Sequence, residues 1–407
     1  MKPKLILCLA LVLSGGLFGC STLHSPVAST GIKNCINKFQ MIDADNGWIW
    51  ADDTNGFHLL HTTNGGQAWA DVTPQSFTNR VWDCQFPKPQ LAWISFYENN
   101  KTRLLLTTNA GKSWVAWSPL GDFPDDEHNF FLVTRDGRFI NDKDGLTVDI
   151  NVGLCQATYD FFETHDGGLN WKPASIVQEG SNEPSSTIQI GDCDGSAVNY
   201  YPPKTIVIAN GDLADETPKG IVRFSVSTDA GKSWRGLTLP VPEKYRDGLV
   251  DSFSPYFFDD KSAVFPVRVC KLETNTDFVF DTLVFYRTED GGNTWSRAPG
   301  ALDFPGRYDV SDTDFVSPNI FFVRHGADLY VTHDGAKTWQ AIKSNVDFQD
   351  VTEMEFLDAT HGWIVNSKRD GIWSPDHGDF YSFTTLYKTS DGGKTWTEIP
   401  LKILHEP

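Results

Sequence analysis

Hydrophobic and polar residues alternate along the chain in short runs, and these runs predict β-strands. Each run is apolar or alternating and is bounded by Asp, Asn or Gly, as expected for strands that end at tight turns. The clearest examples are Phe39–Ile42, Gly47–Trp50 and Phe57–Leu60 near the start, and Met354–Leu357, Gly362–Val365 and Phe383–Tyr387 near the end. No helical period of adequate length interrupts them, so the pattern predicts an all-β chain.

An eight-residue pattern recurs seven times after such runs. It begins with Ser or Thr, has Asp or Asn at its third position and Gly at its fifth, and ends with Trp. The copies begin at Thr62, Thr107, Thr164, Ser227, Thr288, Thr332 and Thr389. Their third residues are Asn64, Asn109, Asp166, Asp229, Asp290, Asp334 and Asp391. The sixth copy departs from the pattern, with Ala336 in place of Gly.

The residue types of the pattern suit a turn that locks a β-hairpin. An Asp or Asn side chain accepts hydrogen bonds from the backbone N–H groups of its own turn. Gly adopts the positive φ that a Cβ would penalise, and the Trp at the start of the next strand buries a large ring. The seven Asp and Asn residues are therefore predicted to be structural and not catalytic.

The spacing of the seven copies predicts a closed ring of sheets. Successive copies begin 45, 57, 63, 61, 44 and 57 residues apart, and each repeat has room for four strands. Four-stranded units of this length describe a β-propeller, whose closure removes exposed sheet edges. We expect a seven-bladed β-propeller of four-stranded antiparallel blades over residues 37–407, with the pattern in the turn between the third and fourth strands. The alternative is a six-bladed ring with an extra hairpin.

The recurring pattern resembles the Asp-box, also called the BNR repeat. With the Gly-Trp pairs Gly47-Trp48 and Gly362-Trp363 ahead of the first and last boxes, nearly all of residues 37–400 is similar to single-propeller proteins of the photosystem II assembly factor type. That resemblance implies a protein that binds other proteins and is not known for catalysis. It identifies the fold and not the partner.

Two enzyme families also carry Asp-boxes. Sialidases clamp the carboxylate of their substrate with three Arg residues, the first of which precedes the first box, whereas Arg80, the first Arg here, follows that box. Xyloglucanases pair two propellers, and this chain has room for one. A glycoside hydrolase needs two carboxylates about 5–10 Å apart, and the sequence leaves that geometry open.

The N-terminus has the order of a secretory signal. Lys2 and Lys4 precede an apolar run from Leu5 to Phe18, which is short for a membrane-spanning helix. The segment Leu17-Phe18-Gly19-Cys20 resembles the lipobox of bacterial lipoproteins, which implies cleavage of residues 1–19 and lipidation of Cys20. Ser21 then favours the outer membrane, facing either the periplasm or the outside, with residues 20–36 as a tether. The alternative is plain secretion with another cleavage site.

The net charge and the cysteine content limit which partners, disulfides and metal sites can be expected. The net charge of −19 becomes −21 without Lys2 and Lys4, which disfavours nucleic acid. The exported compartment permits disulfides, and the nearest-neighbour pairs are Cys35–Cys84 and Cys155–Cys193, although spacing does not fix connectivity. No Cys-x-x-Cys or complete calcium loop is present, so we expect neither a metal nor a cofactor.

Four stretches ahead of third strands are longer than the rest and predict loops on the face opposite the boxes: Arg138–Val152, Asn210–Lys219, Lys271–Asp277 and Ser367–Ser382. The last of them carries Trp373, His377 and Tyr381, a mixture of aromatic and polar groups that suits a protein or glycan surface. Tyr200 and Tyr201 are weaker candidates for ligand contact. The expected function is a monomeric, lipid-anchored scaffold that binds a protein or glycan at the cell envelope; the alternative is a glycoside hydrolase.

Overall fold

The structure is a computed structural model of the whole chain. It describes residues 35–53, 56–75, 77, 79, 81–98, 101–117, 138–139, 143–153, 156–167, 169–177, 183–185, 187–191, 197–201, 204–209, 219–272, 278–304, 311–374, 379–401 and 403–404. The predicted signal, Cys20, nearly all of the tether, and Cys155, Cys193 and His377 lie outside these residues.

The described residues form seven sheets of four or five strands, one two-stranded sheet and a single 3-10 turn, η1 (Glu243–Tyr245). We number the seven larger sheets in chain order. The first three contain β1 (Cys35–Met41), β2 (Gly47–Asp53), β3 (Gly56–Thr62), β4 (Trp69–Asp71) and β33 (Ile403–Leu404); β5 (Val81–Lys88), β6 (Leu91–Glu98), β7 (Lys101–Thr107) and β8 (Val115–Trp117); and β9 (Arg138–Phe139), β10 (Gly145–Gly153), β11 (Gln156–Thr164), β12 (Lys172–Pro173) and β15 (Thr187–Gly191).

The remaining sheets follow the same plan. The fourth and fifth contain β16 (Ala197–Tyr201), β17 (Thr205–Ala209), β18 (Ile221–Ser227) and β19 (Arg235–Pro240); and β20 (Leu249–Ser252), β21 (Tyr256–Phe257), β22 (Ala263–Leu272), β23 (Phe278–Thr288) and β24 (Ser296–Phe304). The sixth and seventh contain β25 (Ser311–Phe315), β26 (Phe321–His325), β27 (Asp328–Thr332) and β28 (Gln340–Ile342); and β29 (Val351–Phe356), β30 (Gly362–Ser374), β31 (Asp379–Thr389) and β32 (Thr397–Ile399). The two-stranded sheet pairs β13 (Ile176–Val177) with β14 (Pro184–Ser185).

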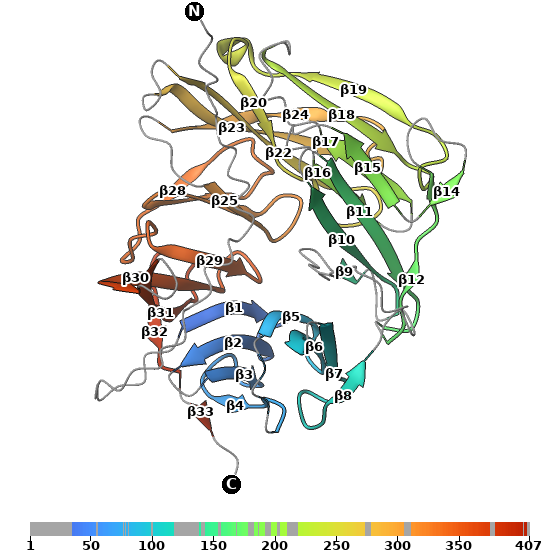
Figure 1. Ribbon diagram of the computed structural model, residues 1–407. Helices are drawn as coiled ribbons and strands as arrows, with labels where there is room; N and C mark the ends of the chain where they lie inside the picture. The colour runs from blue at the N-terminus through green and yellow to red at the C-terminus, as the bar shows by residue number, and fades with distance from the viewer. Residues whose placement is uncertain are drawn as a thin grey trace, which may run out of the picture.

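Within each larger sheet the paired strands are antiparallel, apart from the parallel pair of β4 and β33 in the first sheet. Figure 1 shows the sheets arranged around a common centre, with β1 on the inner side of the first sheet and β4 on its outer side. The prediction of an all-β propeller of four-stranded antiparallel sheets is confirmed. Seven as the number of blades stays a prediction, since the third sheet is irregular: both β12 and β15 pair with β11.

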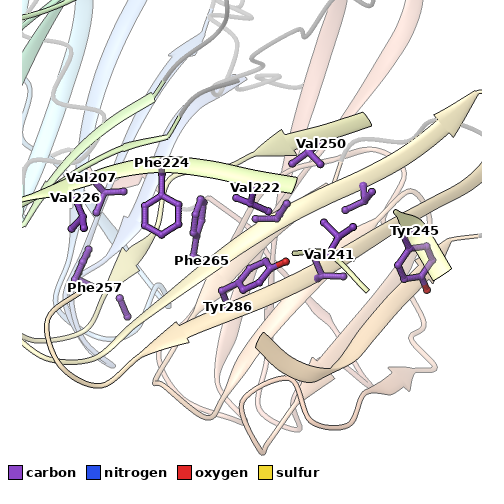
Figure 2. Packing of buried hydrophobic residues seen from close by; sticks show 14 of the residues in the cluster. Val207, Val222, Phe224, Val226, Val241, Tyr245, Val250, Phe257, Phe265 and Tyr286 are labelled. Atoms are coloured by element: carbon purple, nitrogen blue, oxygen red, sulfur yellow. The ribbon is translucent and has the colours of Figure 1, made fainter. Parts of the chain in front are cut away.

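The hydrophobic cores lie between neighbouring sheets. One of them, drawn in Figure 2, joins the fourth sheet to the fifth through Val207, Phe224 and Val226 on one side and Phe265 and Tyr286 on the other. Alternate residues of each strand face the two neighbouring sheets, so both faces of a sheet are covered. The second and third strands of the sheets are therefore apolar in most positions.

The two ends of the chain meet in the first sheet. The C-terminal β33 pairs parallel with β4, so that Ile403 is opposite Trp69 and Leu404 is opposite Ala70. A core that includes Ile49 and Trp69 of the first sheet and Trp363 and Leu386 of the seventh fills the space between these two sheets. The ring is therefore closed by the pairing of β33 with β4 and by the packing of the seventh sheet against the first.

Three of the hairpins between the second and third strands are longer than the others. They are β10–β11, β22–β23 and β30–β31, whose strands contain 9 to 13 residues, compared with 5 in each strand of β26–β27. Most of the predicted loops Arg138–Val152 and Ser367–Ser382 is continued strand, whereas residues 210–218 and 273–277 of the other two predicted loops lie outside the described residues. In an antiparallel sheet, successive turns lie at alternating ends of the strands. The turns between the second and third strands therefore lie on the face opposite the boxes, which are in the turns between the third and fourth strands.

Candidate functional site

The seven Asp-box turns have one common hydrogen-bond pattern. In each, the first Ser or Thr hydroxyl donates to the Oδ1 atom of the Asp or Asn at 2.8–3.0 Å. That Oδ1 atom also accepts the backbone N–H of the residue four positions later, at 2.8–3.0 Å. The side chains of Asn64, Asn109, Asp166, Asp229, Asp290, Asp334 and Asp391 therefore hold their own turns together.

The residue after each Asp or Asn ties its turn to the rest of the sheet. Its N–H donates to a carbonyl in the turn between the first and second strands at 2.8–3.0 Å in all seven sheets. The donors are Gly65, Ala110, Gly167, Ala230, Gly291, Gly335 and Gly392, whose φ angles are between 58° and 81°. The two sets of turns thus lie on the same face, which we call the box face.

Some boxes also bind the preceding part of the ring. The indole Nε1 of Trp234 donates to the carbonyl of Val177 at 2.8 Å, and Trp114 donates to Val72 at 2.9 Å. Val72 follows the last strand of the preceding sheet, and Val177 belongs to the β13–β14 hairpin between the third and fourth sheets. The boxes therefore serve as contacts between sheets as well as hairpin turns.

Four carboxylates on the innermost strands of the sixth and seventh sheets form a separate cluster. We call Asp312 and Asp314 of β25 and Glu353 and Glu355 of β29 the inner carboxylates; all four are half-buried. Glu353 accepts the backbone N–H of Phe39 at 2.8 Å, and Glu355 accepts that of Met41 at 2.6 Å.

Asp314 makes the corresponding bond one sheet earlier, where its carboxylate accepts the N–H of Phe356. These bonds run from the inner strand of one sheet to the inner strand of the next, where a backbone edge would otherwise lack partners.

Burial raises the pKa of each inner carboxylate, against the lowering effect of the hydrogen bonds it accepts. The pKa of Asp314 and that of Glu353 are both raised to about 7, and that of Glu355 is raised well above its ordinary value. Burial also raises the pKa of Asp312, although the Arg324 guanidinium lowers it. The cluster thus contains carboxyl groups that titrate near neutral pH.

A buried ion pair lies in the fifth sheet. The guanidinium Nε of Arg268 donates to Asp281 at 2.7 Å, and the two side chains are 6% and 0% exposed. Asp251 of β20 lies beside them: burial raises its pKa, the positive charge of Arg268 lowers it, and the charge of Asp281 raises it. Among the residues that the structure describes, no group of three or more His, Cys, Asp or Glu side chains is arranged to hold a metal ion.

The comparisons with known proteins agree with a chain built from Asp-box repeats. The family model described as Sortilin, neurotensin receptor 3, matches residues 284–405, which contain the last three boxes. A search of the curated proteins found no match.

Several solved structures are similar at low sequence identity. YCF48 bound to D1 peptide is 16% identical with a TM-score of 0.40, covering 94% of this chain and 97% of its own. The GH74 xyloglucanase from Xanthomonas campestris is 12% identical with a TM-score of 0.40, covering 89% and 66%. A PL25 ulvan lyase is 10% identical with a TM-score of 0.47, covering 88% and 92%.

The boxes in the turns between third and fourth strands and the four-stranded sheets around one centre decide the class. The chain is an Asp-box repeat propeller. In the described parts of this propeller no helix is long and apolar enough to cross a membrane.

The described residues among those predicted to bind a partner belong to two sheets, the fourth and the seventh. Tyr201 is 8% exposed and stacks on Phe257 at 5.1 Å between ring centroids, so it is a core residue and its predicted contact with a ligand is wrong. Tyr200 is in β16 opposite Ile206. Trp373 is in β30 opposite Phe380, and Tyr381 is in β31, so both belong to the long β30–β31 hairpin and not to a loop.

One disulfide prediction is corrected. Cys84 is a free thiol that is fully buried in the core between the first and second sheets, beside Trp48 and Phe86, so the proposed Cys35–Cys84 bond is not formed. Alternation along β5 directs Cys84 into that core together with Phe86, two residues later. Burial raises the pKa of the Cys84 thiol well above its ordinary value, which makes it unreactive.

Two features of the propeller were missed in the sequence. The inner carboxylates could have been found from the sequence. In Asp312-Thr-Asp314 and Glu353-Met-Glu355, acidic residues occupy alternate positions of segments that form the first strand of a sheet. The other feature is a polar groove of about 520 Å³ on the box face, lined by residues 259–263, 287–289 and 318–319. The lining includes Arg287, whose guanidinium donates to the carbonyl of Gly335 at 3.3 Å.

Proposed function

We propose that the propeller is a lipid-anchored scaffold of the cell envelope that binds a protein or glycan partner without transforming it. This proposal rests on the hydrogen bonds that the acidic side chains make. The Asp-box residues hold their own turns, and Asp314, Glu353 and Glu355 accept backbone N–H groups of neighbouring sheets. These carboxylates are committed to supporting the fold.

The proposed binding surface is the face opposite the boxes. The β30–β31 hairpin extends that face, because the pairing continues past Arg369 and Ser382 to Ser374 and Asp379. At about 3.3 Å per residue, the residues beyond the length of β26 and β27 add roughly 20 Å to the hairpin. Trp373 and Tyr381 near its tip are the aromatic groups that a sugar ring or an apolar protein surface would contact.

The test is a binding screen of the purified chain from Ser21 to Pro407 on a glycan array and a panel of polysaccharides, read for both binding and released reducing sugar. The scaffold proposal expects binding without release, weakened at least tenfold by Trp373→Ala or Tyr381→Ala. The control is His333→Ala, because His333 is an exposed residue of the sixth box on the other face. Unchanged binding in both hairpin variants would move the site elsewhere on the propeller.

A chain that binds no sugar would leave a protein as the partner. Crosslinking in cells through a photoreactive residue at position 373, compared with one at position 333, would then identify it. Capture of one defined protein from position 373 and not from 333 is the expected result. Equal labelling from both positions would contradict a binding face at the hairpin.

The anchor is tested separately. Metabolic labelling with a radioactive or clickable fatty acid should label the wild-type chain, and Cys20→Ala should abolish the label and release the protein from membranes. Labelling that survives this substitution would refute lipidation at Cys20 and leave the binding proposal untouched.

The second candidate is a glycoside hydrolase, favoured by the pKa of about 7 of Asp314 and Glu353. A carboxyl group with such a pKa is suited to act as a general acid near neutral pH. Released reducing sugar that falls at least a hundredfold in Asp314→Asn or Glu353→Gln would establish this function and refute the scaffold. Release that both variants retain would place the catalytic pair among other residues.

A further inference from the structure

The junction between the seventh and first sheets differs from the others in its covalent connections. The chain enters each of the later sheets at its first strand, whereas at this junction it passes from β32 to β33, which pairs with β4 at the outer side of the first sheet. The inner strands of the two sheets meet through side chains of the seventh sheet that accept backbone N–H groups of β1: Thr384 Oγ1 accepts that of Ile36 at 2.6 Å, in addition to Glu353 with Phe39 and Glu355 with Met41. The chain segment that links the two sheets therefore lies away from the contact between β29 and β1.

The charges around the two glutamates are unbalanced. Asp312 and Asp314 of β25 face them on one side, and each raises the pKa of a glutamate, Asp312 that of Glu353 and Asp314 that of Glu355. Lys38 of β1 is the cation that acts on Glu353, and its Nζ atom is also 3.4 Å from Asp83 of β5.

Two further cations among the described side chains near the junction have other partners. Arg324 of β26 acts on Asp312. Lys388 of β31 lies 4.8 Å above the ring of Trp363 and donates to the carbonyl of Gly65 at 3.4 Å.

Two opposing effects decide what ionisation does to this junction. An ionised carboxylate accepts an N–H more strongly than a neutral one. It also loses hydration on burial and repels the neighbouring carboxylates. The second effect is larger for both glutamates, because their pKa values are raised despite the hydrogen bonds that they accept and, at Glu353, despite Lys38. A neutral carboxyl group keeps a carbonyl oxygen that accepts the same N–H.

We propose that the contact between β29 and β1 is a pH-responsive latch, closed when Glu353 and Glu355 are protonated and loosened when Glu353 ionises. Loosening frees the inner edge of β1 without unfolding the sheets on either side. The latch acts at the junction where the chain links the two sheets through their outer strands, and it does not depend on the binding partner.

The experiment measures amide hydrogen exchange of the Ser21–Pro407 chain at pH 5 and pH 8, corrected for the intrinsic pH dependence of exchange. Protection of the Phe39 and Met41 amides is expected to fall by roughly tenfold or more at pH 8. In Glu353→Gln/Glu355→Gln, which keeps both acceptor oxygens and leaves neither side chain able to ionise, protection is expected to change less than about twofold. The control is Glu398→Gln, because Glu398 is an exposed residue of β32; it should behave like the wild type.

Amide exchange in low concentrations of urea tests whether the opening is local or is part of global unfolding. A local opening exposes little surface, so protection of Phe39 and Met41 should not depend on urea, whereas amides of β23, which report global unfolding, should lose protection. The latch would be refuted by equal protection at both pH values, by a pH dependence that survives in the double variant, or by urea dependence parallel to that of β23. Circular dichroism checks folding, and the single variant Glu353→Gln, expected to reduce the pH dependence, serves if the double variant does not fold.

Discussion

Gly231 lies against the backbone of Val177 so closely that a Cβ atom at position 231 would be 2.1 Å from the Val177 carbonyl oxygen. Trp234 of the same box donates its indole N–H to that oxygen. The second sheet repeats this relationship, since a Cβ on Gly111 would be 2.4 Å from Val72 Cβ and Trp114 donates to the Val72 carbonyl. In these two boxes the Gly and the Trp together form a contact site, the seat, against which the residue of the preceding part of the ring packs.

Gly231→Ala should therefore destabilise the propeller strongly. The added Cβ clashes with a backbone atom, which no side-chain rotation can move away. The φ of +82° is also unfavourable for Ala. We expect a loss of at least about 3 kcal/mol in the free energy of unfolding, measured by urea denaturation. The matched control is Gly236→Ala in β19, where a Cβ meets nothing within 4 Å; it should change stability by less than about 1 kcal/mol. Similar losses in both variants would contradict the seat.

Ala230→Gly should have the opposite sign. Ala230 has a φ of 62° at the box position that is Gly in five of the seven sheets, and a left-handed conformation costs a residue with a Cβ roughly 1–2 kcal/mol. After the entropy that Gly adds to the unfolded chain, a gain of about 0.5–1 kcal/mol remains, measurable as a raised Tm. Ala341→Gly in the exposed part of β28 should instead lower stability. Destabilisation by Ala230→Gly would show that the methyl group has a packing role.

The buried pair Arg268–Asp281 should respond to a single truncation far more than a surface pair does. Arg268→Ala leaves the carboxylate of Asp281, 0% exposed, without its cation, and we expect a loss of about 3–5 kcal/mol. Arg246→Ala breaks the exposed pair with Glu243, whose side chains are 73% and 82% exposed, and should cost less than about 0.5 kcal/mol. Because the partner left behind causes most of the first loss, Arg268→Met/Asp281→Leu should recover a large part of it.

Stability should fall as pH rises through neutrality, on account of Asp314. Its pKa is about 7 in the folded chain against 3.8 for an ordinary Asp. A raised pKa means that the folded chain holds the proton more tightly, so the contribution to stability is complete below about pH 4 and is lost as pH rises through 7. Since the side chain is half-buried, we expect Asp314→Asn to raise stability by about 1–2 kcal/mol at pH 8 and to have little effect at pH 4.

The control for this titration is Asp350→Asn, which removes one charge from an exposed residue. Urea denaturation of both variants at pH 4 and pH 8 separates the local effect from net charge. Equal stabilisation by both substitutions at pH 8 would attribute the effect to the overall charge of −19 and not to the place of Asp314.

The sequence by itself determined the repeating unit. The boxes require only neighbouring residues, because the Asp or Asn, the Ser or Thr and the Gly all interact within one turn, so a local pattern is enough to predict them. The same holds for the short alternating strands and for the all-β propeller they form. Even Ala336, which departs from the pattern, adopts the expected turn with a φ of 63°.

The tertiary structure decided whatever depends on residues distant in the chain. Only folding brings Glu353 within 2.8 Å of the Phe39 N–H, 314 residues away, and shifts the pKa of that carboxyl group, because burial and neighbouring charges are properties of the assembled ring. It also decided that Cys84 and Tyr201 face cores and that the predicted seventh-sheet loop is a continued hairpin. In each of these cases the surroundings of a side chain come from other sheets, and no local pattern of residues specifies them.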